Sequence, residues 1–309
     1  MSKMVSDETL GVILVSLSTC TASIANMCIK RLAGLVVPIH TLQMIRFRML
    51  PTWIVCLSYL YITGRPSPFL GPKGIRGLLI GRGSLSFVSM LGTYTALKGL
   101  TLAEATLIGF LNPVITGILG AVCLGEKYTL RQAIATLLSL AGILISLQTP
   151  LQTLGKAPRL SADLGAGGGM GKGVALIIGV GSVTAGALSS ILIRKMGKNG
   201  DVVRQITAYA MVSTLGSTAC IRYMPGIPEL PRYGTWTIYA IVATVFGSLG
   251  QVLMTSGMKR GKAGTSALGN YTAIIYATLL EYAVDGKVPG MRQVVGCGLI
   301  VGASLYGRR

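Results

Sequence analysis

Apolar residues along the chain are gathered into long unbroken blocks, separated by short stretches that carry most of the charge. A block of about 20 apolar residues is long enough to cross the hydrocarbon core of a bilayer as a helix. Backbone groups in lipid must pair within the protein, and unbroken blocks favour helices over the alternating strands of a barrel. The pattern therefore predicts an all-α integral membrane protein with ten transmembrane helices. The ten blocks are residues 10–29, 38–62, 76–97, 102–124, 130–148, 173–194, 203–224, 235–258, 263–284 and 291–307.

A polar stretch rich in Gly, Pro and Ser interrupts the blocks at residues 149–172 and predicts a flexible linker. It divides the chain into two units of five helices, residues 1–148 and 173–309. Aligning the units places Glu126 on Asp285, and the two units share the order of their turns and helices. Because five is odd, the second unit would enter the membrane from the opposite side. Such inverted repeats are typical of secondary transporters that work by alternating access.

Composition supports the membrane interpretation. Hydrophobic residues make up 51% of the chain and charged residues only 12%, about half the share in a soluble domain. The 42 glycines are explained by close helix packing in a bilayer, and Gly298 with Gly302 has the spacing of a helix-packing pair. Asp7 and Glu8 precede the first block, which predicts a retained helix and not a cleaved signal peptide.

The net charge of +19 does not indicate nucleic-acid binding, because Lys and Arg lie mainly in the short loops. There they would set topology and meet anionic lipid headgroups. If both termini are cytosolic, that side carries 15 Lys and Arg residues against 10 on the other. The positive-inside rule thus predicts a multi-pass protein with cytosolic termini, and it leaves open whether the membrane is the plasma membrane or an endomembrane.

Residues that carry common catalytic chemistry are scarce. All six cysteines lie in apolar segments without a CxxC pair, and His40 is the single histidine. With no clustered carboxylates and no phosphate-binding loop, the sequence predicts no enzyme, no metal site and no cofactor. Transport would then be energised by exchange or an ion gradient, or run downhill.

The segment from Arg82 to Ser146 carries a family resemblance. It has an Arg-Gly start at Arg82, a tyrosine at Tyr94, a Phe-x-x-Pro motif at Phe110, and a closing Leu-x-Glu that ends at Glu126. This pattern resembles the EamA repeat of the drug/metabolite transporter superfamily, close to the G branch of solute carrier family 35 and its fungal relatives. The second half is similar to the same family at Gly250, Gln251, Leu253, Thr255, Gly257, Ala263, Gly264, Tyr271, Ala277 and Glu281.

The resemblance covers nearly the whole chain and implies two inverted five-helix EamA repeats. It also implies transport of a small-molecule substrate, which in this family ranges from sugars and nucleotide-sugars to amino acids, amines and drugs. The chain departs from the usual family residues at Thr95, Asn112, Gly261 and Ala273. If these positions shape the cavity, the substrate of this member differs from those of its relatives.

Arginines inside the predicted helices are the first candidates for a binding site. Arg48 lies about a turn and a half inside the second block, after Arg46, and Arg82 lies near the start of the third. Charged groups in a membrane usually face a cavity or a partner, and a guanidinium suits carboxylate or phosphate. The alternative is that these side chains snorkel to the headgroups.

Uncharged polar residues form the second group of candidates. Asn112 with Pro113 falls halfway along the fourth block, and Asn270 with Tyr271 falls similarly in the ninth. The repeat would bring these pairs together near the midplane, where transporters bind substrate, and Pro113 would free a backbone carbonyl. The alternative is ordinary hydrogen bonding between helices. Tyr94 and Gln251, near the ends of the third and eighth blocks, complete the predicted substrate site.

Acidic residues offer one candidate for ion coupling. Thr101 to Glu104 has the spacing of a capping box, and Glu126 and Asp285 close turns, so these three carboxylates are interpreted as structural. Glu281 lies about a turn deeper and is the candidate proton-coupling carboxylate.

Four hypotheses of function remain open at this point. The leading hypothesis is a secondary transporter of a small organic metabolite, with the embedded arginines favouring an anion. The first alternative is a proton-linked exporter of amines or drugs. The second alternative is a non-transporting membrane scaffold or enzyme, and the third is a ten-helix channel. Lipid is the expected environment, and a homodimer is left open.

Overall fold

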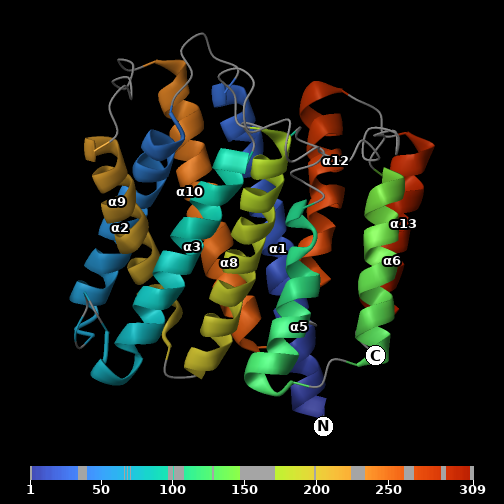
Figure 1. The fold of residues 1–309 in the computed structure, drawn as a ribbon, viewed down its shortest axis with the longest axis horizontal. Coiled ribbons are helices and arrows are strands. Elements are labelled where there is room, and N and C mark those ends of the chain that lie inside the picture. Colours follow the sequence, from blue (N-terminus) through green and yellow to red (C-terminus); the bar gives the residue numbers. More distant parts are fainter. Residues whose placement is uncertain are drawn as a thin grey trace.

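The computed structural model is a bundle of helices that stand side by side, roughly parallel or antiparallel to one another (Figure 1). It describes residues 2–33, 40–65, 67, 69, 71–96, 100, 108–126, 129–146, 171–197, 200–223, 234–260, 268–286 and 290–306. These residues form α-helices and two short 3-10 segments, with no strand among them. The elements are α1 (Ser2–Ala33), α2 (Thr41–Ile62), η1 (Lys73–Ile75), α3 (Arg76–Ala96), α5 (Asn112–Leu124), α6 (Leu130–Ser146), α8 (Lys172–Met196), α9 (Val202–Tyr223), α10 (Thr235–Arg260), η3 (Leu268–Thr272), α12 (Ala273–Asp285) and α13 (Met291–Tyr306).

The all-helical fold agrees with the sequence prediction. Three helices are long and apolar enough to cross a membrane, over Thr9–Cys28, Gly173–Met196 and Trp236–Arg260. Shorter apolar helices cover Asn112–Leu124 and Met291–Ala303. The described part of the chain contains ten α-helices, and the number that span the bilayer stays a prediction.

Helix boundaries reveal the internal repeat. One constant offset in numbering relates the first residues of three helix pairs, namely Thr41 of α2 to Val202 of α9, Asn112 of α5 to Ala273 of α12, and Leu130 of α6 to Met291 of α13. Helices α5 and α12 both end at a glycine with a left-handed backbone, Gly125 and Gly286, which the same offset pairs. Glycine adopts this conformation without the steric cost of a Cβ. The sequence alignment of Glu126 with Asp285 is therefore out of register at this hairpin, so that pairing is wrong.

The two repeats pack against each other through equivalent helices. Helix α1 packs on α10 and α8 packs on α3, while α12 contacts α1 and α5 contacts α8. The pairs α2 with α9 and α6 with α13 join helices at equivalent positions. Helix α5 occupies the lower half of the view in Figure 1 and α12 the upper half, and α1 begins at the same end at which α13 ends. This pattern is that of two interlocked units of opposite direction.

Helices α5 and α12 begin in the interior of the bundle and not at its ends. Thirteen residues span about 20 Å, which is shorter than the hydrocarbon core. Pro113 occupies the first turn of α5, where its missing N–H costs no hydrogen bond. The prediction that Asn112 and Pro113 lie halfway along one helix is thus wrong for the described residues. They begin α5, and the corresponding segment before α12 is the 3-10 turn η3.

Two local details of the sequence take on a structural role. His40 caps α2: its Nδ1 accepts from the Leu42 N–H at 3.3 Å, and its own N–H donates to Gln43 Oε1 at 3.2 Å. Gly142 lets α6 approach α13, because a Cβ there would lie 2.8 Å from the Gly296 carbonyl oxygen. Among the described residues, nothing lies within 4 Å of a Cβ built at Gly298 or Gly302, so the structure gives these two glycines no packing partner within the chain.

Many serine and threonine hydroxyls bond to a carbonyl of their own helix. Thr184 donates to Val180 at 2.9 Å, Thr207 to Val203 at 2.8 Å and Thr244 to Ala240 at 2.8 Å. Ser18, Thr21 and Ser23 of α1 do the same within one helical turn. These hydroxyls therefore need no partner on a neighbouring helix.

Several sequence predictions fall outside the described residues. They concern the linker at residues 149–172, nearly all of it undescribed, and the capping box from Thr101 to Glu104. The side chains of Tyr94, Glu281 and Asp285 also lie outside this part, although their backbones belong to α3 and α12.

Candidate functional site

A cavity of about 350 Å³ lies between helices of both repeats. Helices α1, α2, α3 and α5 of the first repeat and α8, α9 and α10 of the second contribute its walls. Four residues predicted from the sequence line it together: Arg48, Arg82, Asn112 and Gln251. The other lining residues are Ala22, Asn26, Ser86, Ser89, Met90, Thr93, Gly186, Ser189, Ser190, Ile193, Tyr209 and Met254.

Arg82 is the most buried charged residue of the site, with 1% of its surface exposed. Its Nη1 donates to the Gln205 main-chain oxygen at 2.7 Å and its Nη2 to Thr255 Oγ1 at 3.0 Å. The guanidinium carbon lies 5.8 Å from the centre of the Tyr209 ring, and Nε has no hydrogen-bond partner among the described residues. The snorkelling alternative does not apply to Arg82, because its guanidinium donates to residues of α9 and α10 inside the bundle. All the contacts named here are to neutral groups, which leaves a buried positive charge without a counter-ion among them.

Arg48 enters the cavity from α2. Its Nη2 donates to the Gly247 carbonyl at 3.2 Å, and its buried Nε has no partner in the part of the chain that the structure describes. Gly247 is needed for this approach, because a Cβ at that position would lie 2.6 Å from Arg48 Cζ. Because Gly247 has no side chain, the Arg48 guanidinium can lie directly against α10.

Hydroxyl groups complete the polar surface around the two arginines. Ser86 of α3 and Ser189 of α8 share a hydrogen bond of 2.6 Å, and Ser189 also donates to the Arg82 carbonyl at 3.4 Å. Asn112 Oδ1 accepts from Thr116 Oγ1 at 3.4 Å, at the first residue of α5. None of the described residues that line the cavity is acidic. The site therefore offers positive charge and hydroxyl groups to a solute.

The two arginines lie in equivalent pairs of helices. Arg48 contacts α10 from α2, and Arg82 contacts α9 from α3. The repeat relates α2 to α9 and α3 to α10, and the offset between the starts of α2 and α9 places Arg48 on Tyr209. Sequence reasoning missed Tyr209, and the correct repeat offset was the signal that would have found it. Both charges come from the first repeat, so the cavity is electrically asymmetric.

Tyr271 and Asn270 are not among the residues that line the cavity. Tyr271 is fully buried and packs with Phe110, Leu268, Ile274 and Ile300. Asn270 is partly buried beside it in η3. The binding role expected of these two residues, of Tyr94 and of Glu281 stays a prediction.

Comparisons with known proteins agree with this architecture. The EamA-like transporter family matches residues 9–148 and 173–306, one match for each five-helix unit. The chain belongs to the EamA-like transporter family. This confirms the resemblance noted from the segment that begins at Arg82.

Individual relatives of this EamA chain support the same assignment. It is 28% identical over 303 residues to human solute carrier family 35 member G1, covering 96% of the chain and 78% of the relative. It is 25% identical to the probable transporter vicT of the fungus Bipolaris victoriae, covering 88% and 77%. One solved crystal structure superposes on this chain with a TM-score of 0.70 and is 20% identical in sequence. The match covers 99% of this chain and 96% of the other, which shows a shared fold.

The EamA assignment settles the class of protein. The chain is a multi-pass membrane transporter and not an enzyme, with a small-molecule substrate and a lipid environment.

Proposed function

We propose that this EamA protein is a secondary transporter that moves a small organic anion by alternating access. Ten membrane-spanning segments arranged as two inverted five-helix repeats would rock around the cavity between them. The observation that carries the proposal is the buried Arg82 guanidinium, which faces the cavity with neutral partners only among its named contacts.

Electrostatics favours an anion over a cation in this cavity. A buried guanidinium that lacks a counter-ion is costly, and a solute carboxylate or phosphate would supply the missing negative charge. A cationic amine would meet two arginines and none of the described acidic groups. The hydroxyls of Ser86, Ser89 and Ser190 add hydrogen-bond partners for a polar solute.

The topology proposed with this function has both termini in the cytosol. Under this orientation the end of the bundle that holds Arg65, Arg194 and Lys259 faces the cytosol, in agreement with the excess of positive charge in its loops.

Counterflow into proteoliposomes tests the proposal. Vesicles preloaded with each member of an anion, amine and neutral metabolite panel are given the labelled solute, with and without a pH gradient. Accumulation of a preloaded anion is the expected result. Accumulation of amines alone, driven by the pH gradient, would replace the proposal with the proton-linked exporter.

Two arginines on one helix provide a matched pair of variants. Arg48→Ala removes a guanidinium from the cavity, and Arg46→Ala removes one that does not line it. Loss of a charge-assisted contact of about 1.5–3 kcal/mol lowers anion uptake by Arg48→Ala at least about tenfold. Arg46→Ala keeps uptake near the parent value. Full uptake by Arg48→Ala would remove the anion argument.

A further inference from the structure

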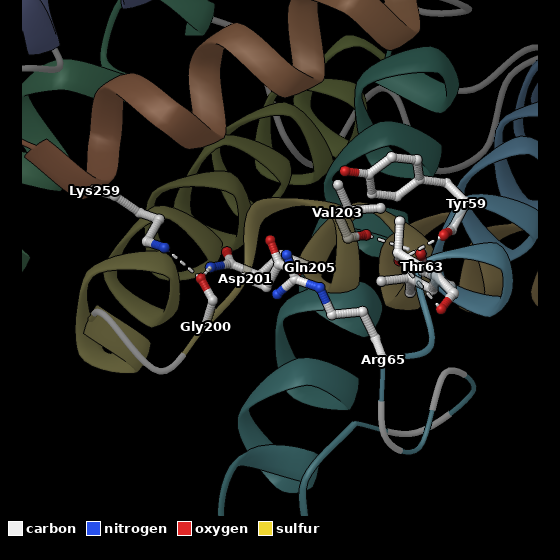
Figure 2. Close-up of polar contacts among 10 residues, drawn as sticks. Tyr59, Thr63, Arg65, Gly200, Asp201, Val203, Gln205 and Lys259 are labelled. Carbon is white, nitrogen blue, oxygen red and sulfur yellow. Dashed lines mark hydrogen bonds and ion pairs between the residues drawn. The ribbon is translucent and has the colours of Figure 1, made fainter.

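A cluster of polar residues lies at the end of the bundle where α1 begins and α13 ends. We call it the end cluster and define it as Arg65, Glu126, Arg194, Gly200, Asp201 and Lys259. Arg194 Nε and Nη2 both contact Glu126 Oε1, at 3.2 and 2.5 Å, and Nη1 donates to the Lys259 carbonyl at 3.3 Å. Lys259 Nζ donates to the Gly200 carbonyl, and Arg65 pairs with Asp201 at 3.3 Å. Figure 2 shows Lys259 reaching Gly200 from one side and Arg65 extending toward Asp201 from the other.

The end cluster joins the two repeats. Arg65 follows α2 and Glu126 follows α5, both in the first repeat, whereas Arg194, Asp201 and Lys259 belong to the second. Two ion pairs of the described residues, Arg65 with Asp201 and Arg194 with Glu126, therefore cross the boundary between repeats. In an alternating-access transporter, contacts of this kind must break before the cavity opens at that end.

Arg82 connects the cavity to the end cluster through two routes. Its Nη1 holds the main-chain oxygen of Gln205, and the Gln205 side chain donates from Nε2 to the Gly200 carbonyl at 3.0 Å. Its Nη2 donates to Thr255 Oγ1. Thr255 lies on α10 one helical turn, about 6 Å, before Lys259. Both routes run from α3 of the first repeat to elements of the second.

The geometry of a guanidinium makes one route sensitive to an anion. Bidentate recognition of a carboxylate or phosphate uses two adjacent N–H groups. On Arg82 these are either Nε with Nη2 or Nη1 with Nη2, so both arrangements draw on the Nη2 that now donates to Thr255. Nη2 carries two N–H groups, so a bound anion shares this nitrogen with Thr255, and its negative charge competes with the neutral hydroxyl and weakens the Thr255 contact.

We propose that the end cluster is the gate of the cavity at this end, and that Thr255 and Gln205 couple the Arg82 guanidinium to it. With no anion bound, the hydrogen bonds of Arg82 join α3 to α9 and α10 and keep the gate closed. An anion on Arg82 weakens the contact with Thr255 and favours opening. The inference rests on the proposed transport function, and it assigns positioning roles to two residues outside the cavity wall.

Access of a thiol reagent to the cavity through this end measures the gate directly. Ser190→Cys is the reporter, because Ser190 lines the cavity one helical turn before Arg194. It is placed in a chain whose six native cysteines are replaced by serine or alanine and which retains the parent's detergent melting curve. A membrane-impermeant maleimide is added to sealed vesicles on the side that carries the chain termini, with no solute present.

Two variants should open the gate and one should not. Thr255→Val and Gln205→Leu remove a buried hydrogen bond each and raise the labelling rate about tenfold. Thr244→Val removes a buried hydroxyl from the same helix as Thr255, one bonded to its own helix at Ala240, and leaves the rate within about twofold of the parent. Parent-like labelling of folded Thr255→Val and Gln205→Leu would overturn the gate assignment.

A double-variant cycle separates coupling from general loosening. In an Arg82→Met background, Thr255→Val should add nothing to the labelling rate, because the hydroxyl acts through the guanidinium. An equal further increase in that background would refute the coupling role of Thr255. Because the labelling assay contains no solute, failure of counterflow would count against the proposed function alone, and failure here against the gate alone.

Discussion

Phe110 and Tyr271 are the same position in two copies of one repeat, and their rings pack against each other with centroids 6.2 Å apart. The offset that relates α5 to α12 also relates these two residues. Each comes just before the N-cap residue of its helix, Leu111 for α5 and Thr272 for α12. Contact between equivalent positions places this pair at the centre of the pseudo-twofold relation between the repeats.

The aromatic pair should be energetically coupled. Phe110→Leu and Tyr271→Leu each keep an apolar side chain but lose one ring, and the double variant loses both. We expect a coupling free energy of about 0.5–1.5 kcal/mol, since ring pairs contribute this much beyond area burial. Reversible unfolding in mixed detergent measures it. Additive single effects would show that the two rings pack independently.

Gly247→Ala should impair transport without unfolding the protein. The new methyl group would lie 2.6 Å from Arg48 Cζ, and the flexible arginine side chain would move away from the cavity. We expect anion exchange to fall about tenfold, as for the loss of one charge-assisted contact, while the melting temperature stays near that of the parent. Gly181→Ala is the control, because none of the described residues lies within 4 Å of a Cβ built there. Equal effects of the two variants would contradict the role of Gly247.

Gly142→Ala should destabilise the pair formed by α6 and α13. A Cβ at Gly142 meets the Gly296 carbonyl oxygen at 2.8 Å and Ile300 Cγ1 at 2.9 Å, so the two backbones must separate. The expected loss is about 1–3 kcal/mol, typical of overpacking. Gly298→Ala on α13 has open space around it and should unfold with the parent. Thermal unfolding followed by tryptophan fluorescence distinguishes the two.

Asn112→Asp tests the sign of the charge that the cavity accepts. The change adds a negative charge to the cavity wall with almost no change of shape, which should lower apparent anion affinity about tenfold or more. Competition uptake measures this affinity, and Asn112→Ser controls for loss of the amide. Anion affinity that is the same in Asn112→Asp as in the parent would count against an anion bound at this wall.

Sequence alone locates most of the helices, because long apolar blocks leave little choice in a bilayer. The third, fifth, eighth and tenth blocks begin at the first residues of α3, α6, α10 and α13. The fourth and ninth blocks are predicted as continuous, since hydropathy does not register where a helix begins inside an apolar stretch. Pro113 is the available signal, because a proline in the first turn of a helix marks its start.

The cavity is predictable in part. Arg48, Arg82, Asn112 and Gln251 stand out in the sequence because polar groups are rare and costly in apolar helices. Tyr209 escapes notice because an alignment of the repeats that is out of register hides its relation to Arg48. The partners of Arg82, on α9 and α10, depend on how the repeats interlock, and no local pattern encodes that.

Hydroxyl groups bonded within their own helix bear on how such a chain is made. Thr184, Thr207 and Thr244 each satisfy their donor one turn earlier on the same helix. These three hydroxyls can therefore enter lipid during synthesis already paired, before any neighbouring helix has arrived. The buried Arg82 has no such local partner, because both of its acceptors belong to the second repeat. The Arg82 guanidinium of α3 therefore gains these two hydrogen-bond acceptors only after the second half of the chain has been synthesised.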